Sequence, residues 1–152
     1  MKLYLFRHGE AEAAVAGDAE RHLTQAGSRR NRATAALFMQ RGVAVELALV
    51  SPYVRAHETA ADLAAELGNL AFQESHLLTP DADVSGIIEF LEQTPAGSTL
   101  LVGHNPLLSR LLSLLVAGET AACPGLETSE LACLSLDVVA PGCGQIDYRL
   151  RA

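Results

Sequence analysis

Short apolar stretches alternate with longer amphipathic stretches along most of the chain, and this alternation restricts the fold more than any other feature. Strands are predicted at Leu3–Phe6, Val43–Val50 and Leu100–Gly103. Helices are predicted from Ala26 to Gly42, Tyr53 to Leu67, Val84 to Glu92, and between Pro106 and Gly118. Strands that alternate with helices form a mainly parallel sheet, because each connecting helix packs on one face of it. We therefore expect an α/β fold of three layers, with helices on both faces of a central sheet.

The C-terminal quarter of the chain has a different pattern. Two β-rich stretches, Glu130–Val139 and Gln145–Leu150, are separated by the turn-forming sequence PGCG. This arrangement predicts two final strands that pair antiparallel. A chain of 152 residues with 49% hydrophobic residues is long enough for one well-packed core and short for two. We expect residues 1–152 to form a single domain.

The charge and the N-terminal sequence exclude several classes of protein. A net charge of -7 argues against nucleic-acid binding, which depends on clustered Lys and Arg. No apolar run approaches the roughly 20 residues that a membrane span needs, and the first ten residues, MKLYLFRHGE, do not resemble a signal peptide. We expect a cytoplasmic protein that binds neither nucleic acid nor membrane.

The cysteines and histidines do not have the spacing of a metal site. The three cysteines lie ten residues apart, and an odd number leaves one unpaired in any disulfide scheme. The five histidines contain no pair spaced i, i+4. We predict no metal and no other cofactor, and we expect the cysteines to be small apolar residues rather than nucleophiles. They are Cys123, Cys133 and Cys143.

Polar residues follow three of the predicted strands directly. Arg7 and His8 follow the first strand, Ser51 follows the second with Arg55 shortly after it, and His104 follows the third. The carboxyl ends of parallel strands meet at one edge of the sheet, where ligands of α/β proteins bind. Two arginines and two histidines would form a cationic pocket there, which suits a phosphoryl group. Histidine is also a competent nucleophile, and nearby positive charge keeps its ring neutral.

The same residues resemble a known family. Arg7-His8-Gly9-Glu10 is similar to the RHG signature of the histidine phosphatase superfamily, which shares its fold with cofactor-dependent phosphoglycerate mutases. Two further blocks resemble that superfamily's second and third motifs, and they are Ser51-Pro52 with Arg55-Ala56 and Thr59, and Gly103-His104-Asn105-Pro106. The spacing, the short chain, Arg21 with Leu23-Thr24, and Leu78-Thr79-Pro80 resemble the SixA-type phosphohistidine phosphatases.

The resemblance implies a phosphoglycerate mutase-like fold and a two-step phosphoryl transfer. His8 would attack phosphorus and carry the phosphoryl group, and water would then hydrolyse this intermediate. Arg7, Arg55 and His104 would bind and neutralise the phosphoryl oxygens. Two residues have open roles: Arg21 shapes the entrance to the site, and Ser51 either donates to phosphate or caps its helix.

The general acid and the substrate remain open at this stage. The acids between the second and third motifs are Glu74, Asp81 and Asp83, and none has the context of the glutamate that larger family members use. A phosphoramidate such as phosphohistidine has a better leaving group than an alkyl phosphate once its nitrogen is protonated, which favours phosphohistidine as the substrate. We expect the partner to be a phosphohistidine-bearing protein such as a phosphotransfer domain. The alternatives are a phosphatase of small phosphomonoesters and a non-catalytic phosphate-binding module, and the sequence does not indicate the oligomeric state.

Overall fold

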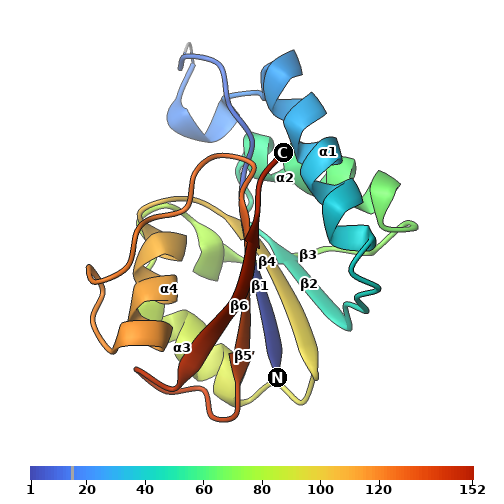
Figure 1. Cartoon of the computed structure of the whole chain (residues 1–152). Helices are drawn as coiled ribbons and strands as arrows, with labels where there is room; N and C mark the ends of the chain where they lie inside the picture. Colours follow the sequence, from blue (N-terminus) through green and yellow to red (C-terminus); the bar gives the residue numbers. More distant parts are fainter. Residues whose placement is uncertain (15) are drawn as a thin grey trace.

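A sheet of six strands forms the centre of the computed structural model, which describes residues 1–14 and 16–152 (Figure 1). The strand order is β3-β2-β4-β1-β5-β6. The strands in this described part are β1 (Lys2–Arg7), β2 (Leu47–Val50), β3 (Gln73–Glu74), β4 (Ser98–Gly103), β5 (Leu131–Leu136) and β6 (Gly144–Leu150). The first four strands are parallel to one another, whereas β5 is antiparallel to both β1 and β6. The predicted mainly parallel sheet with an antiparallel C-terminal pair is confirmed.

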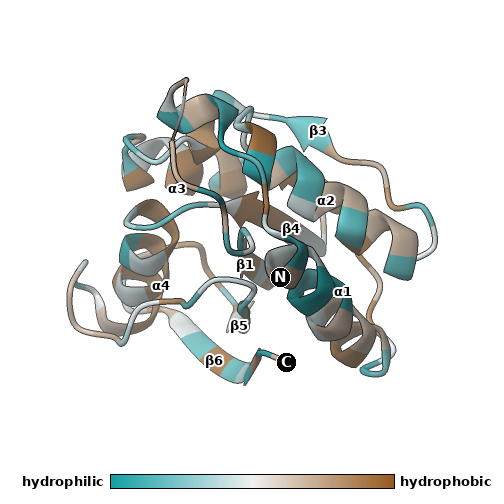
Figure 2. Cartoon of the chain, turned by 90° about the horizontal axis from the view of Figure 1, so that it is seen from above, coloured by the Kyte–Doolittle hydropathy of each residue, from teal (hydrophilic) through white to brown (hydrophobic). Residues whose placement is uncertain are grey.

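Helices cover both faces of this sheet, as the sequence predicts. The helices are α1 (Gln25–Met39), α2 (Val54–Glu66), α3 (Val84–Glu92) and α4 (Leu107–Ala117), with short 3₁₀ turns η1 (Asp18–Glu20) and η2 (His76–Leu78). Figure 2 shows α1 and α2 on one side of the sheet and α3 and α4 on the other. No helix among the described residues is both long and apolar enough to cross a bilayer.

The alternation of side chains along β1 divides the core into two parts. Leu3 and Leu5 face α3 and α4 and pack with the leucines of α4. Tyr4 and Phe6 face α1 and α2, where the ring of Tyr4 packs against that of Phe38 with centroids 4.8 Å apart. Successive side chains of a strand point to opposite faces, so one buried strand supplies both cores. This burial fixes the position of the end of β1, which carries Arg7 and precedes His8.

The structure differs from the sequence prediction at the second strand and at its neighbour on the sheet edge. The predicted strand Val43–Val50 is paired only from Leu47 onward, as β2. The hydroxyl of Ser98 donates to Ala44 O and accepts from Glu46 N, which also donates to the backbone oxygen of Ser98 at 3.1 Å. Contacts with this one residue therefore hold the segment before Leu47 in place of a continuous strand ladder. The second difference is β3, two residues at the sheet edge, which have no strand pattern in the sequence.

The start of α1 packs directly against the segment that follows His8. Thr24 caps the helix as predicted, with its hydroxyl accepting a hydrogen bond from Gly27 N at 2.9 Å. Thr24 N donates to Glu10 O at 2.9 Å. A Cβ on Gly27 would overlap the carbonyl group of Glu10, so only glycine allows the helix to come this close. The position of α1 is therefore coupled to the backbone just beyond His8.

Candidate active site

The ends of three neighbouring strands bring the predicted residues together. In the register of β1 and β4, Arg7 lies beside Gly103, so His8 and His104 follow at adjacent positions. His8 N donates to Gly103 O at 3.0 Å, and the two imidazole rings lie 4.9 Å apart. Ser51 follows β2, where its backbone N–H donates to Val102 of β4. The common edge predicted from topology is thus confirmed for these residues.

His8 has a single neutral form that fits its hydrogen bonds. Its Nδ1 lies 2.7 Å from the carbonyl oxygen of Gly9, which only accepts, so Nδ1 carries the proton. Its Nε2 is then unprotonated and accepts a hydrogen bond from Arg55 Nε at 3.1 Å. The lone pair of His8 is therefore directed at the guanidinium group of Arg55.

Arg55 lies in the first turn of α2 and is buried. Its three nitrogens are all engaged. Nε donates to His8, Nη1 donates to the backbone oxygen of Asp18 at 2.6 Å, and Nη2 donates to the Asp18 carboxylate at 3.1 Å. Asp18 belongs to η1 in the long loop between β1 and α1, and the sequence analysis did not select it as a site residue. A carboxylate three residues before Arg21, in a long loop that starts at the RHG segment, was the available signal.

His104 and Ser51 form a second hydrogen-bonded pair. His104 Nε2 lies 2.7 Å from Ser51 Oγ, and Tyr53 N donates to the same oxygen at 3.4 Å. The Tyr53 ring lies against both His104 and Arg55, with distances of 5.0 Å to the imidazole centroid and 5.1 Å to the guanidinium carbon. Ser51 precedes Tyr53, the N-cap residue of α2, and its closest contact is with His104 rather than with the helix. Tyr53 was not predicted.

Two buried nitrogens at this site have no partner among the described residues. They are Arg7 Nε and His104 Nδ1. Arg7 is held by its Nη1, which donates to Leu126 O at 2.9 Å, whereas its Nε donates to no described residue. Buried polar groups are nearly always hydrogen-bonded in folded proteins. An anion between Arg7, Arg55 and His104 would supply acceptors to such groups.

Burial keeps both histidine rings neutral. It lowers the pKa of His8 to about 4, opposed by the hydrogen bond to Gly9 O and assisted by the positive charges of Arg55, Arg7 and Arg21. It lowers the pKa of His104 to about 3, with further contributions from His8 and Arg55. The sequence analysis attributed the neutral ring to nearby positive charge, and the structure makes burial the larger cause. At neutral pH, His8 Nε2 is available as a nucleophile.

A buried hydrogen-bond network holds the backbone behind His8. Asn31 is fully buried and donates to Thr59 Oγ1 and to Asp62, while its oxygen accepts from Ser129 Oγ. Thr59 accepts from Gly9 N, and Ser129 N donates to the carbonyl oxygens of Arg7 and His8. A Cβ on Gly9 would lie 2.7 Å from the Asn31 amide oxygen. Gly9 is therefore required by the space available, and its φ does not lie in the left-handed region. Of this network, the sequence analysis named only Thr59.

Several candidates from the sequence lie outside the central cluster, which consists of Arg7, His8, Arg55 and His104. Arg21 donates to Glu12 O and to the Asp18 carboxylate, so it is joined to Arg55 only through Asp18. Glu74 lies on the edge strand β3, where it bonds to His57 at 2.8 Å. Asp83 caps α3 by accepting from Ser85 N. Asp81 is exposed and lies just before α3. Among the described residues, no three His, Cys, Asp or Glu side chains are grouped as metal ligands.

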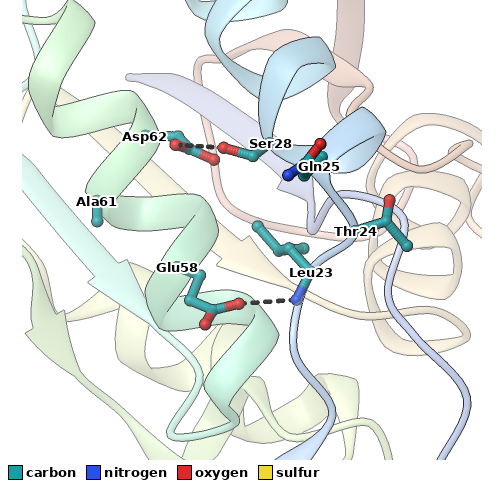
Figure 3. Close-up of a pocket in the computed structure, with 7 residues that line it drawn as sticks. All are labelled: Leu23, Thr24, Gln25, Ser28, Glu58, Ala61 and Asp62. Carbon is teal, nitrogen blue, oxygen red and sulfur yellow. Dashed lines mark hydrogen bonds between the residues drawn. The ribbon is translucent and has the colours of Figure 1, made fainter.

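A cavity of about 360 Å³ lies next to this cluster, between the start of α1 and the outer face of α2 (Figure 3). Glu58 is on its wall and accepts hydrogen bonds from His22 and Leu23 N, which holds the loop before α1. Asp62 forms another part of the wall and accepts from Ser28 at 2.9 Å. None of Arg7, His8, Arg55 and His104 lines this cavity, so the cavity lies beside these four side chains and does not contain them. Its lining residues are Leu23, Thr24, Gln25, Ser28, Glu58, Ala61 and Asp62.

Comparison with known proteins agrees with this geometry. The family model of the histidine phosphatase superfamily (branch 1) matches residues 3–79, which include Arg7, His8, Ser51 and Arg55. The chain belongs to the histidine phosphatase superfamily. Within this superfamily it is 34% identical over 142 residues to phosphohistidine phosphatase SixA of Escherichia coli (strain K12), covering 90% of this chain and 86% of that protein. It is also 34% identical over 129 residues to a SixA homolog of Haemophilus influenzae, covering 76% and 77% of the two chains.

The structural similarity to SixA covers nearly all of this chain. The structure of the protein histidine phosphatase SixA complexed with tungstate superimposes with a TM-score of 0.88 and 31% sequence identity. The superposition covers 99% of this chain and 97% of that one. The phosphoglycerate mutase-like α/β fold expected from the motifs is therefore confirmed.

Proposed function

We propose that this chain is a phosphatase that hydrolyses phosphohistidine on proteins through a covalent intermediate on His8. The observation that carries the proposal is the state of His8: a buried neutral ring with its proton fixed on Nδ1 and its Nε2 lone pair facing Arg55. The similarity to SixA over nearly the full length of both chains supports the choice of substrate. The tungstate in that SixA structure is a tetrahedral oxyanion like phosphate, which supports an oxyanion site in this fold.

In the first step, His8 Nε2 attacks the phosphorus of the substrate. The new P–N bond forms to His8 as the P–N bond to the substrate imidazole breaks. Arg55 and Arg7 bind the phosphoryl oxygens, and their fixed positive charges stabilise the spreading negative charge of the transition state. His8 keeps its proton on Nδ1, so the phosphorylated ring is an imidazolium held by Gly9 O.

In the second step, water attacks the same phosphorus from the side that the substrate imidazole has left. The P–N bond to His8 breaks and returns the electron pair to Nε2, which restores the neutral ring. Both protons of the water remain on the product, which leaves as dihydrogen phosphate. Atoms and charges balance without a separate base.

This chemistry favours a phosphoramidate over an ester. When the second nitrogen of the substrate phosphohistidine is protonated, cleavage of its P–N bond releases a neutral imidazole, so the first step exchanges one phosphoimidazolium for another. An alkoxide leaving group needs a proton donor instead. The acids considered from the sequence do not provide one at His8: Glu74 is bound to His57, Asp83 caps α3, and Asp81 is exposed before α3. The geometry therefore supports phosphohistidine better than a small phosphomonoester.

The test is a side-by-side assay of two substrate classes. The protein is incubated with a phosphohistidine-bearing phosphotransfer domain and, separately, with a panel of sugar phosphates and nucleotides. Phosphate release is followed together with the mass of the His8 peptide, kept at neutral or alkaline pH because phosphohistidine is acid-labile. His8→Ala is the test variant, and His76→Ala is the matched histidine control, because His76 is the exposed residue of η2.

We expect rapid loss of phosphohistidine, a transient adduct of one phosphoryl group on His8, and loss of both in His8→Ala but not in His76→Ala. Turnover of the small esters alone would retain the mechanism and overturn the substrate. No adduct and no turnover would favour the non-catalytic binding module. A His8→Ala variant as active as the wild type would refute the nucleophile.

A further inference from the structure

The edge of Arg55 that faces His8 is already occupied by a carboxylate. In a guanidinium group, the Nε–H and one N–H of Nη2 point along the same edge, and this pair binds phosphate oxygens bidentately. Arg55 uses Nε for His8 and Nη2 for Asp18 Oδ2, at 3.1 Å each. The Asp18 carboxylate is therefore placed where an oxygen of a bound phosphoryl group would contact Arg55.

We propose that Asp18 is an internal competitor, whose carboxylate competes with phosphoryl groups for Arg55. A ligand that binds Arg55 through both Nε and Nη2 must first displace this carboxylate. The inference rests on the proposed function only in taking Arg55 as a phosphoryl-binding residue. It adds an internal competitor that weakens the binding of every phosphoryl ligand by the same displacement cost.

The contacts of Asp18 are strong enough to hold it and weak enough to be broken. Its carboxylate accepts from Arg55 and from Arg21 Nη1 at 3.1 Å, and its backbone oxygen accepts from Arg55 Nη1. Partial burial opposes ionisation of Asp18, but the hydrogen bonds from Arg21 and Arg55 outweigh it and lower the pKa of the carboxyl group. The side chain is nevertheless 54% exposed, so it can turn into solvent while the backbone contact to Arg55 remains.

The position of the loop makes this rotation local. The loop that carries Asp18 is closed at its base by Glu12 N, which donates to His22 O at 2.8 Å, and by the bridge between Ala11 and Leu23. Release of one carboxylate therefore does not require the β1–α1 connection to open. Arg21, which was predicted to shape the entrance, has a defined part in this arrangement because it holds the competing carboxylate.

The consequence is weaker binding of every phosphoryl ligand at this site. Inorganic phosphate and small phosphomonoesters must displace Asp18 with the contacts of the phosphoryl group alone. The competing carboxylate therefore lowers product inhibition by phosphate.

The experiment measures the binding of inorganic phosphate by titration calorimetry at pH 7, together with KM and kcat for p-nitrophenyl phosphate. The test variant is Asp18→Asn, which removes the charge and keeps the shape. Glu20→Gln is the matched control, because it removes one negative charge from the same short turn η1, and Glu20 makes no ion pair with Arg55 in the described structure. Arg55→Gln establishes whether the measured phosphate is bound at this site.

We expect Asp18→Asn to bind phosphate on the order of tenfold more tightly and to lower KM by a similar factor, with kcat within about twofold of the wild type. Glu20→Gln should stay within about twofold of the wild type in both measurements. Unchanged or weaker phosphate binding in Asp18→Asn, or a large loss of kcat, would overturn the competitor role and make Asp18 a support for Arg55 or a participant in the chemistry. Phosphate binding that does not depend on Arg55 would instead overturn the phosphoryl site itself.

Discussion

Replacement of Gly27 by alanine tests how tightly α1 is coupled to the site. Alanine normally stabilises a helix relative to glycine by about 0.5–1 kcal/mol. Here the new Cβ would overlap Glu10 O and lie 2.8 Å from Glu10 N, both backbone atoms two residues beyond His8. The added Cβ would lie 2.3 Å from Glu10 O, whereas ordinary contact needs at least 3.4 Å, so either α1 or the backbone at Glu10 has to move by about 1 Å.

Overpacking of this kind costs roughly 1–3 kcal/mol, which outweighs the gain in helix propensity. We therefore expect Gly27→Ala to lower the free energy of unfolding in urea by about 1–2 kcal/mol. We also expect kcat to fall about 10- to 100-fold, because a displacement near 1 Å at a reacting group has effects of that size.

Gly86→Ala is the matched control. Gly86 lies in α3, and its added Cβ would meet only the flexible end of the Leu77 side chain, at 3.0 Å. This variant should be as stable as the wild type or slightly more stable, with unchanged activity. If Gly27→Ala were also as stable and as active as the wild type, the close packing of α1 on Glu10 would not hold His8 in place.

Two further predictions concern buried polar groups. The folded rings of His8 and His104 titrate at about 4 and about 3, well below the unfolded value of 6.5, so between pH 6.5 and 4 the unfolded chain binds more protons than the folded one. Stability should therefore fall by roughly 2–5 kcal/mol from pH 7 to 4.5 in urea unfolding, and by less in His104→Gln; equal profiles would contradict the buried neutral pair. Asn31→Ala should lower stability by about 2–4 kcal/mol, because Asp62 and Ser129 lose buried partners, whereas Ser28→Ala should cost under about 1 kcal/mol. A loss of stability in Asn31→Ala as small as that in Ser28→Ala would show that the buried network contributes little to stability.

Local patterns were enough to place most of the fold and the candidate residues. The stretch before Arg7 is apolar on both faces and the stretch after Thr24 has helical spacing, and both became the expected elements, β1 and α1. His8, Ser51 and His104 each follow a strand, and parallel strands end at one edge whatever their order in the chain. It was therefore possible to predict that these three residues share one edge of the sheet without knowing the strand order β2-β4-β1.

The details that decide the chemistry depend on contacts between distant parts of the chain. Asp18 meets Arg55 across 37 positions, and Asn31 meets Ser129 across 98, so no local pattern reports either contact. The strand prediction from Val43 failed for the same reason, since Ser98 supplies the hydrogen bonds there.

We could predict from the sequence the α/β layers, the edge of the sheet that carries the site, and the arginines and histidines at that edge, because each of these follows from local periodicity and from the geometry of parallel strands. The packed structure was needed to show which nitrogen of His8 carries the proton, that Asp18 contacts Arg55, and how the network behind Gly9 is built. These depend on burial and on the approach of side chains from separate elements, and both are properties of the packed chain.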